Sequence, residues 1–159
     1  MEQILIRPME ERQAAEVSAL IGRVLIEVNI RDYTREALQE FVDYYSPEQV
    51  AAIPKNGGHS YVAMLGEELL GCGSIVPSEE KAGESIIQAL YVHPDWEGKG
   101  IGRLLMEVLE ADPLFRDAGR VAVSASITAH EFYLKLGYRY QDGIKVCEDN
   151  DHYWMEKFN

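Results

Sequence analysis

Tyr91 to Leu105 reads Tyr-Val-His-Pro-Asp-Trp-Glu-Gly-Lys-Gly-Ile-Gly-Arg-Leu-Leu, and this stretch is more informative than the rest of the chain. It predicts the end of a strand, a glycine-rich turn and the start of a helix in direct succession. Such a turn leaves backbone N–H groups unpaired and aims them at one point, where the helix adds the positive end of its dipole. The stretch therefore predicts an anion site, and a pyrophosphate is the anion that fits it best.

The spacing of the glycines excludes two better-known phosphate loops. Arg103 stands where a dinucleotide fingerprint needs its third glycine, and no Lys-Ser or Lys-Thr pair closes the turn as a P-loop requires. Lys99 and Arg103 can add positive charge near a bound phosphate. Spacing alone fits a turn without a ligand equally well, but the place between a strand and an amphipathic helix favours the anion site. The residues assigned to it are Gly98, Lys99, Gly100, Ile101, Gly102 and Arg103.

The formal net charge of −12 at pH 7 limits the partners of the chain. Binding to nucleic acid needs a basic face that neutralises phosphates, and the sequence offers none. The acidic balance weakly favours a cationic second substrate such as an amine, although charge that only keeps the protein soluble explains it better. A polyanion that binds so acidic a chain needs local donors, which the glycine turn supplies.

Length and composition are typical of a soluble globular protein. The 159 residues fit one domain, which we expect to span 1–159, and 47% of them are hydrophobic. No apolar run is long enough to span a bilayer, and the first residues do not have the basic region and apolar stretch of a signal peptide. We therefore expect a cytoplasmic protein without a membrane partner. Cys72 and Cys147 match no zinc spacing and are expected to be free thiols, and we expect no metal. The oligomeric state stays open, a homodimer included.

Hydrophobic periodicity predicts a mixed central sheet flanked by helices, in the α/β or α+β class. Thr34 is expected to cap one helix, and the capping boxes 46–49 and 128–131 open two more. The helix after the glycine turn has an apolar face of Ile101, Leu104, Leu105, Val108 and Leu109. The predicted strands are 4–6, 60–65, 69–76, 85–92, 121–127, 138–146 and 153–158.

Two segments resemble the markers of one family. Asp95–Leu105 is similar to the signature of the GNAT superfamily of acyl-CoA-dependent N-acetyltransferases, whose pattern is Gln or Arg, two residues, Gly, one residue, then Gly or Ala. Ala129–Tyr138 resembles the family's other marker, an alanine, a Phe-Tyr pair and then Leu-Gly-aromatic. The order of the elements also resembles the family along nearly the whole chain: strand, two helices, three antiparallel strands, helix, strand, helix, strand. This resemblance implies a mixed, mostly antiparallel central sheet flanked by helices.

The resemblance implies acetyl-CoA as the cosubstrate and assigns backbone groups to it. In the family the amides of the glycine turn hold the pyrophosphate of coenzyme A, which here falls to Gly98 through Arg103. The pantetheine arm lies along the preceding strand, here Leu90, Tyr91 and Val92. The resemblance also implies that an N–H near Val92 polarises the acetyl carbonyl and stabilises the negative charge that forms there by about 3 kcal/mol.

At three further positions the chain is compared with the family: Tyr133 matches its pattern, and Glu97 and Ser126 depart from it. Tyr133, in the Phe-Tyr pair, is implied to protonate the departing thiolate of coenzyme A, although its spacing alone favours core packing. Glu97 stands at the Gln/Arg position, where we expect only its backbone to face a phosphate while its side chain faces solvent. Ser126 stands where many members have an asparagine that bonds the pantetheine, and a hydroxyl still donates one hydrogen bond.

The general base is left unassigned. Many members use a strand glutamate, but Ile86 and Gln88 occupy the inward positions of strand 85–92, where Gln88 can only orient a water. Glu84 and His93 lie at the two ends of that strand and are weak candidates. Deprotonation of the amine by solvent is the alternative.

The acceptor pocket is expected beneath residues 28–33, with Asp32 and Tyr33 as candidate contacts. Loop packing and an Arg31–Asp32 ion pair are the alternatives. We expect direct transfer of an acetyl group to the primary amine of a small molecule, with a protein N-terminus or lysine as the second acceptor class. A coenzyme A-binding sensor without turnover is the alternative function, and a nucleotide-dependent oxidoreductase is disfavoured by the glycine spacing.

Overall fold

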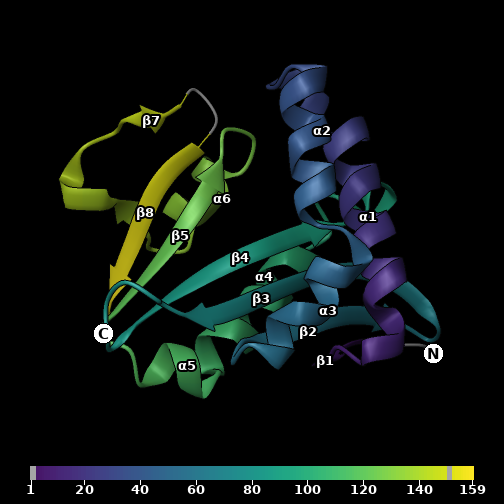
Figure 1. The fold of residues 1–159 in the computed structure, drawn as a ribbon, viewed down its shortest axis with the longest axis horizontal. Coiled ribbons are helices and arrows are strands. Elements are labelled where there is room, and N and C mark those ends of the chain that lie inside the picture. Colours follow the sequence, from purple (N-terminus) through teal and green to yellow (C-terminus); the bar gives the residue numbers. More distant parts are fainter. Residues whose placement is uncertain (1–2, 150–151) are drawn as a thin grey trace.

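The computed structural model describes residues 3–149 and 152–159, and within them the chain forms one twisted eight-stranded sheet with helices on both faces (Figure 1). The strand order is β1-β2-β3-β4-β5-β8-β6, and β7 pairs with β8. The strands are β1 (Ile4–Pro8), β2 (His59–Leu65), β3 (Glu68–Pro77), β4 (Glu84–Val92), β5 (Arg120–Ser126), β6 (Arg139–Tyr140), β7 (Cys147–Glu148) and β8 (His152–Phe158). The α-helices are α1 (Ala14–Glu27), α2 (Arg35–Tyr44), α3 (Pro47–Lys55), α4 (Ile101–Ala111), α5 (Pro113–Arg116) and α6 (His130–Lys135).

The two faces of the sheet carry separate apolar cores. Helix α1 buries Val17, Ile21 and Leu25 against one face, in a cluster that includes Val62 of β2 and Cys72 of β3. On the other face α4, α5 and α6 pack around a second cluster, in which Met106, Leu109 and Phe115 meet strand residues such as Val121 and Met155. The mixed sheet flanked by helices that the sequence predicts is therefore confirmed. Among the described residues no helix is long and apolar enough to cross a membrane.

The sheet opens between β4 and β5, its one parallel pair of strands among those described. The two strands pair only from Glu84 with Arg120 to Ile87 with Val123. Beyond Ile87, β4 continues along β3 through a register shift, and Ala89 there adopts φ +58°. A residue with positive φ in a bulge bends its strand away from the regular pleat. The ends of β4 and β5 therefore diverge and leave a gap between them.

Two of the three predicted helix N-cap residues are confirmed. Thr34 Oγ1 accepts a hydrogen bond from the Ala37 N–H (3.2 Å), and Ser46 Oγ accepts one from the Gln49 N–H (3.3 Å). The predicted cap at Thr128 is wrong, because α6 starts one residue later, at His130, and the Thr128 hydroxyl donates to another segment. Short helices depend on their surroundings more than on local signals.

Two further predictions fail for identifiable reasons. In α4 the buried stripe includes Met106, whereas Leu104 remains 36% exposed, because the sheet contacts a face rotated from the predicted one. The predicted strand 138–146 is reduced to the two residues of β6, since Asp142 and Gly143 adopt positive φ and turn the chain away from β8. The chain returns to the sheet only at β7.

Asp112 is the buried charge that joins α5 to β2. Its side chain is fully buried and accepts hydrogen bonds from the Tyr61 hydroxyl, from His59 Nδ1 (2.8 Å) and from the Leu114 N–H (2.8 Å). Burial alone would raise the pKa of this carboxyl, but the hydrogen bonds from Tyr61 and His59 outweigh burial and hold the pKa below its ordinary value.

Replacing Asp112 with Ala should therefore lower the free energy of unfolding by about 3 kcal/mol, because buried donors lose their acceptor. Urea unfolding at pH 7 measures this, with the exposed Asp117→Ala as the control. A folded-state pKa below the unfolded one means that the ionised group stabilises the fold above the unfolded pKa, and that this stability is lost as pH falls through the folded pKa. Equal unfolding midpoints for the two variants would contradict the prediction.

Candidate active site

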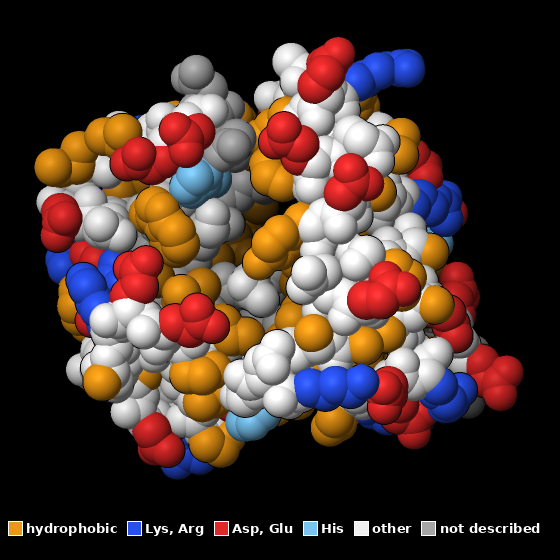
Figure 2. All heavy atoms as spheres, viewed as in Figure 1, with side chains coloured by type: hydrophobic (Ala, Val, Ile, Leu, Met, Phe, Trp, Pro, Cys, Tyr) orange, Lys and Arg blue, Asp and Glu red, His pale blue; other side chains and the backbone are white. Residues whose placement is uncertain are grey.

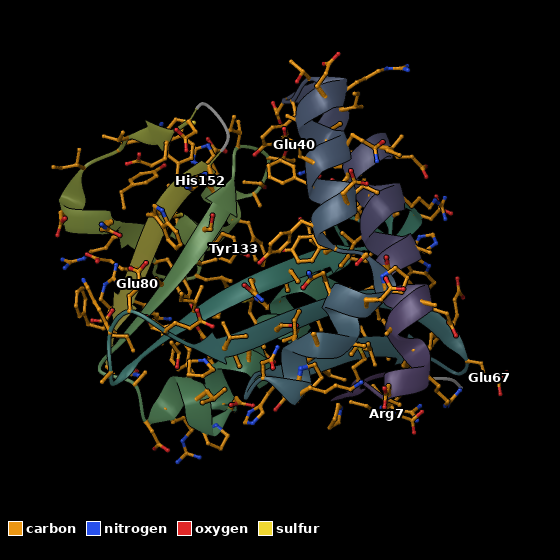
Figure 3. All side chains as sticks on the ribbon, viewed as in Figure 1. Arg7, Glu40, Glu67, Glu80, Tyr133 and His152 are labelled. Carbon is orange, nitrogen blue, oxygen red and sulfur yellow. The ribbon has the colours of Figure 1, made fainter. Side chains whose placement is uncertain are left out.

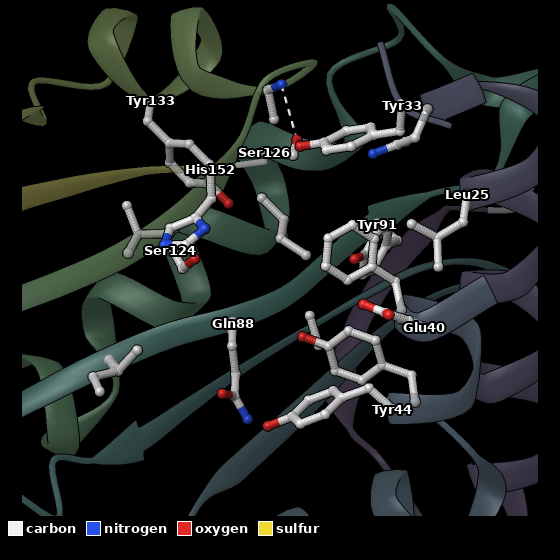
Figure 4. Close-up of a pocket in the computed structure, with 18 of the residues that line it drawn as sticks. Leu25, Tyr33, Glu40, Tyr44, Gln88, Tyr91, Ser124, Ser126, Tyr133 and His152 are labelled. Carbon is white, nitrogen blue, oxygen red and sulfur yellow. Dashed lines mark hydrogen bonds between the residues drawn. The ribbon is translucent and has the colours of Figure 1, made fainter. Parts of the chain in front are cut away.

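Two cavities meet at the gap between β4 and β5. The turn cavity, of about 390 Å³, lies between the end of β4 and the start of α4. The larger cavity, of about 540 Å³, lies between β4, β5 and α2 (Figure 4). The residues that line both are Asn29, Leu90, Tyr91, Ser126 and Ala129. The bulged end of β4 therefore forms a wall common to the two cavities.

The glycine turn forms one end of the turn cavity. Gly98 and Gly100 adopt φ of +76° and +83°, a backbone conformation in which glycine avoids the strain of other residues. Gly100 is the N-cap of α4, and among the described residues no side chain caps the helix. The first amides of α4 therefore point outward without a partner from the cap. A Cβ built on Gly98 or Gly100 would meet no described atom within 4 Å, so the space in front of these amides is open.

The predicted cosubstrate residues gather at the turn cavity with one exception. Those that line it are Leu90, Tyr91, Val92, Gly98, Gly100, Ile101, Gly102, Arg103 and Ser126. Lys99 is not among the lining residues, because its ammonium lies over the ring of Trp96, 5.1 Å from the centroid. The side chain of Glu97 is 55% exposed and lies 3.7 Å from the Arg31 guanidinium. Arg31 therefore pairs with Glu97 rather than with Asp32, the partner named as an alternative from the sequence.

The segment after α1 is tied to the loop between β5 and α6. Asp32 Oδ2 accepts a hydrogen bond from the Thr128 hydroxyl (2.7 Å), and Tyr33 Oη accepts one from the Ile127 N–H (2.8 Å). Tyr33 lines the larger cavity, as an acceptor contact would, whereas Asp32 lines neither cavity. These two bonds hold α2 over the gap in the sheet, so the walls of the larger cavity come from distant parts of the chain.

Several elements contribute polar side chains to the larger cavity, among them α2, β4, β5, α6 and β8 (Figure 3 and Figure 4). Glu40 projects from α2, Gln88 from β4, Tyr133 from α6 and His152 from β8. Ser126 on β5 is the register partner of His152 on β8. The inward position of Gln88 agrees with the sequence pattern. Sequence reasoning missed Glu40 and His152, and the only signal for His152 was its place two residues before Trp154, on the same face of a strand.

Glu84 and His93, the two candidate bases named from sequence, lie elsewhere. Glu84 forms an ion pair with Arg120 at the far end of β4 (2.9 Å). His93 follows β4, where its Nδ1 accepts a hydrogen bond from the Asp95 N–H and its Nε2 lies 2.9 Å from the Arg23 guanidinium. Neither residue is among those that line the two cavities.

Burial keeps three of the tyrosines that line the larger cavity protonated at neutral pH. Burial raises the pKa of Tyr133, whose ring packs edge-on against Phe132 and Tyr138. Burial also raises the pKa of Tyr45 and of Tyr91. Each of these hydroxyls can therefore donate a proton or a hydrogen bond but cannot serve as a base. The carboxylate of Glu40 and the imidazole of His152 are the proton acceptors among the described lining residues.

Comparison with known proteins identifies the same fold and family. A family model described as acetyltransferase (GNAT) domain matches residues 29–157. A GCN5-related N-acetyltransferase from Rhodopseudomonas palustris is 26% identical with a TM-score of 0.80, over 100% of this chain and 98% of that one. The PaiA N-acetyltransferase from Thermoplasma acidophilum, solved in complex with coenzyme A, is 19% identical with a TM-score of 0.77 over 99% of both chains.

An aminoglycoside 6′-acetyltransferase type Ii is also similar, at 19% identity and a TM-score of 0.72 over 97% of this chain and 96% of that one. None of the curated protein sequences matches the chain significantly. The family match covers most of the chain, including the glycine turn and the Phe-Tyr pair, and the sheet with its flanking helices agrees with it. The chain belongs to the GNAT acetyltransferase family.

Proposed function

We propose that residues 1–159 form one N-acetyltransferase domain that moves an acetyl group from acetyl-CoA directly to the primary amine of a small molecule. The observation that carries the proposal is the junction of two cavities at the open end of β4. One cavity has the glycine turn and the other has Tyr133 and His152. A thioester at the junction is within reach of an amine that enters from the larger cavity.

The turn cavity fits the diphosphate of acetyl-CoA. The outward amides of α4 and the open space before Gly98 and Gly100 suit an anion, and Arg103 adds positive charge. Residues 90–92 of β4 have no partner on β5, so their backbone can bind the pantetheine arm as an added strand does. Ser126 lines both cavities and accepts a hydrogen bond from the Ala129 N–H, which leaves its hydroxyl proton for the cosubstrate.

His152 is the residue that we assign to take the proton of the substrate ammonium. An amine attacks only after it has lost this proton, and an imidazole can accept a proton near neutral pH. Titratable groups around His152 include Tyr133 on α6 and Glu40 on α2, which line the same cavity, and Glu148, its register partner on β7. Of these, Tyr133 is kept protonated by burial and acts later, as the acid for the thiolate.

Replacing His152 with Gln should lower kcat/KM at pH 7 by at least about tenfold, because the amine must then lose its proton to solvent. The deficit should shrink as pH rises toward the pKa of the amine, where the free base is already present. A pH profile of initial rates measures this, and His93→Gln is the matched control, since that histidine lines neither cavity. A constant deficit across the pH range would assign His152 a structural role instead.

The function itself is tested by calorimetry with acetyl-CoA and by release of free thiol with a panel of small amines. Binding together with thiol release that depends on an amine supports the proposal. Absence of binding to the folded protein would refute it. Binding without thiol release from any acceptor would favour the coenzyme A sensor, and turnover with peptides alone would favour the protein acceptor.

A further inference from the structure

The charge of the larger cavity restricts what enters it. Glu40 is the one carboxylate among the described lining residues, and the described lining contains no lysine or arginine. The remaining polar groups there are neutral amides, hydroxyls and the imidazole of His152. A negatively charged group in this cavity would thus lose water without gaining a basic side chain, which makes its burial unfavourable. A positively charged group would gain the Glu40 carboxylate.

Aromatic rings form much of the wall. Tyr44 is 59% exposed at the mouth, and its ring meets that of Tyr45 edge to face, with the centroids 4.8 Å apart. The aromatic lining residues are Tyr33, Phe41, Tyr44, Tyr45, Tyr91, Tyr133 and Trp154. Such rings bind apolar bodies, and their faces attract cations. Figure 2 shows the same arrangement on the surface, where hydrophobic side chains surround a hollow and acidic side chains lie on the neighbouring helix α2.

We propose that the acceptor is a primary amine on an aromatic or apolar body that carries no carboxylate, sulfonate or phosphate group. This inference rests on the proposed function and narrows its substrate class. The volume of about 540 Å³ suits a small molecule of this kind. Glu40 attracts the ammonium and repels anionic competitors, and the rings bind the body. Amino acids that share the same body are excluded by their carboxylate.

A matched pair of probes isolates the carboxylate. 2-Phenylethylamine and phenylalanine share a phenyl ring and a primary amine and differ in one carboxylate. We expect kcat/KM to favour 2-phenylethylamine by about 30-fold, because the amino acid must desolvate its carboxylate opposite Glu40. Glu40→Gln should reduce this preference several-fold by slowing the amine and sparing the amino acid. Glu107→Gln removes the same charge from the exposed face of α4, and should leave the preference unchanged.

The outcomes separate this inference from the proposed function. If acetyl-CoA does not bind, the proposed function fails. If acetyl-CoA binds and phenylalanine is acetylated as well as 2-phenylethylamine or better, only the substrate class is overturned. If neither probe is acetylated, calorimetry is used to compare the affinities of the two probes for the protein saturated with coenzyme A. Tighter binding of the amine supports the inference, whereas equal binding, or no binding of either probe, overturns it.

Discussion

Replacing Gly100 with Val should weaken acetyl-CoA binding by at least about 100-fold, which corresponds to about 2.7 kcal/mol. Gly100 ends the glycine turn with φ +83° and caps α4, and its Cα faces open space where we place the diphosphate. A valine side chain would occupy this space and keep phosphate oxygens away from the first amides of the helix. It would also disfavour the left-handed backbone on which the direction of those amides depends. Calorimetric titration with acetyl-CoA measures the loss.

Gly83→Val separates ligand binding from backbone strain. Gly83 adopts φ +79°, and a Cβ there also meets no described atom within 4 Å, but it lies in the exposed loop before β4. Both substitutions place a branched residue in the left-handed region, so each should lower the free energy of unfolding by about 1–3 kcal/mol. Only the Gly100 variant should lose acetyl-CoA. Equal affinities in the two variants would argue against a diphosphate at the turn.

The parts of the fold that the sequence predicts correctly are those governed by neighbouring residues. The caps at Thr34 and Ser46, the hairpin of β2 and β3, and the turn before α4 all depend on local backbone preferences. The end of α6 has the same local character, because Gly137 adopts φ +95° just after the helix and the Tyr138 N–H donates to the Tyr133 carbonyl across that glycine. Each of these signals lies within a few residues of the feature that it predicts.

The parts that the sequence does not reveal depend on contacts between distant segments. Ala89 has no special propensity for positive φ, and its bulge arises where β4 has two residues for one of β3. Glu40 and His152 meet at one cavity because α2 is tied over the gap in the sheet and β8 pairs with β5. A single helix or strand pattern contains none of this information, so a base on β8 could not be assigned from spacing.

Tyr133→Phe should lower kcat by about 100-fold and leave the affinity for acetyl-CoA nearly unchanged. The substitution keeps the ring, and with it the contacts to Phe132 and Tyr138, and removes only the hydroxyl that lines the larger cavity. Without that proton donor, coenzyme A must leave as a thiolate or wait for water. Because burial raises the pKa of Tyr133, the phenol keeps its proton at neutral pH and well above it. Deprotonation of Tyr133 should therefore not lower the wild-type rate below about pH 10.

Tyr138→Phe is the matched control for this prediction. Tyr138 belongs to the same core cluster, but its hydroxyl donates to Glu110 Oε2 (2.7 Å) and it does not line either cavity. Loss of this hydrogen bond should lower the free energy of unfolding by about 1 kcal/mol and leave kcat unchanged. Pre-steady-state measurement of thiol release compares the variants at the chemical step. If Tyr133→Phe behaved as Tyr138→Phe does, with reduced stability and full turnover, the hydroxyl of Tyr133 would be a packing group and the leaving thiolate would take its proton from elsewhere.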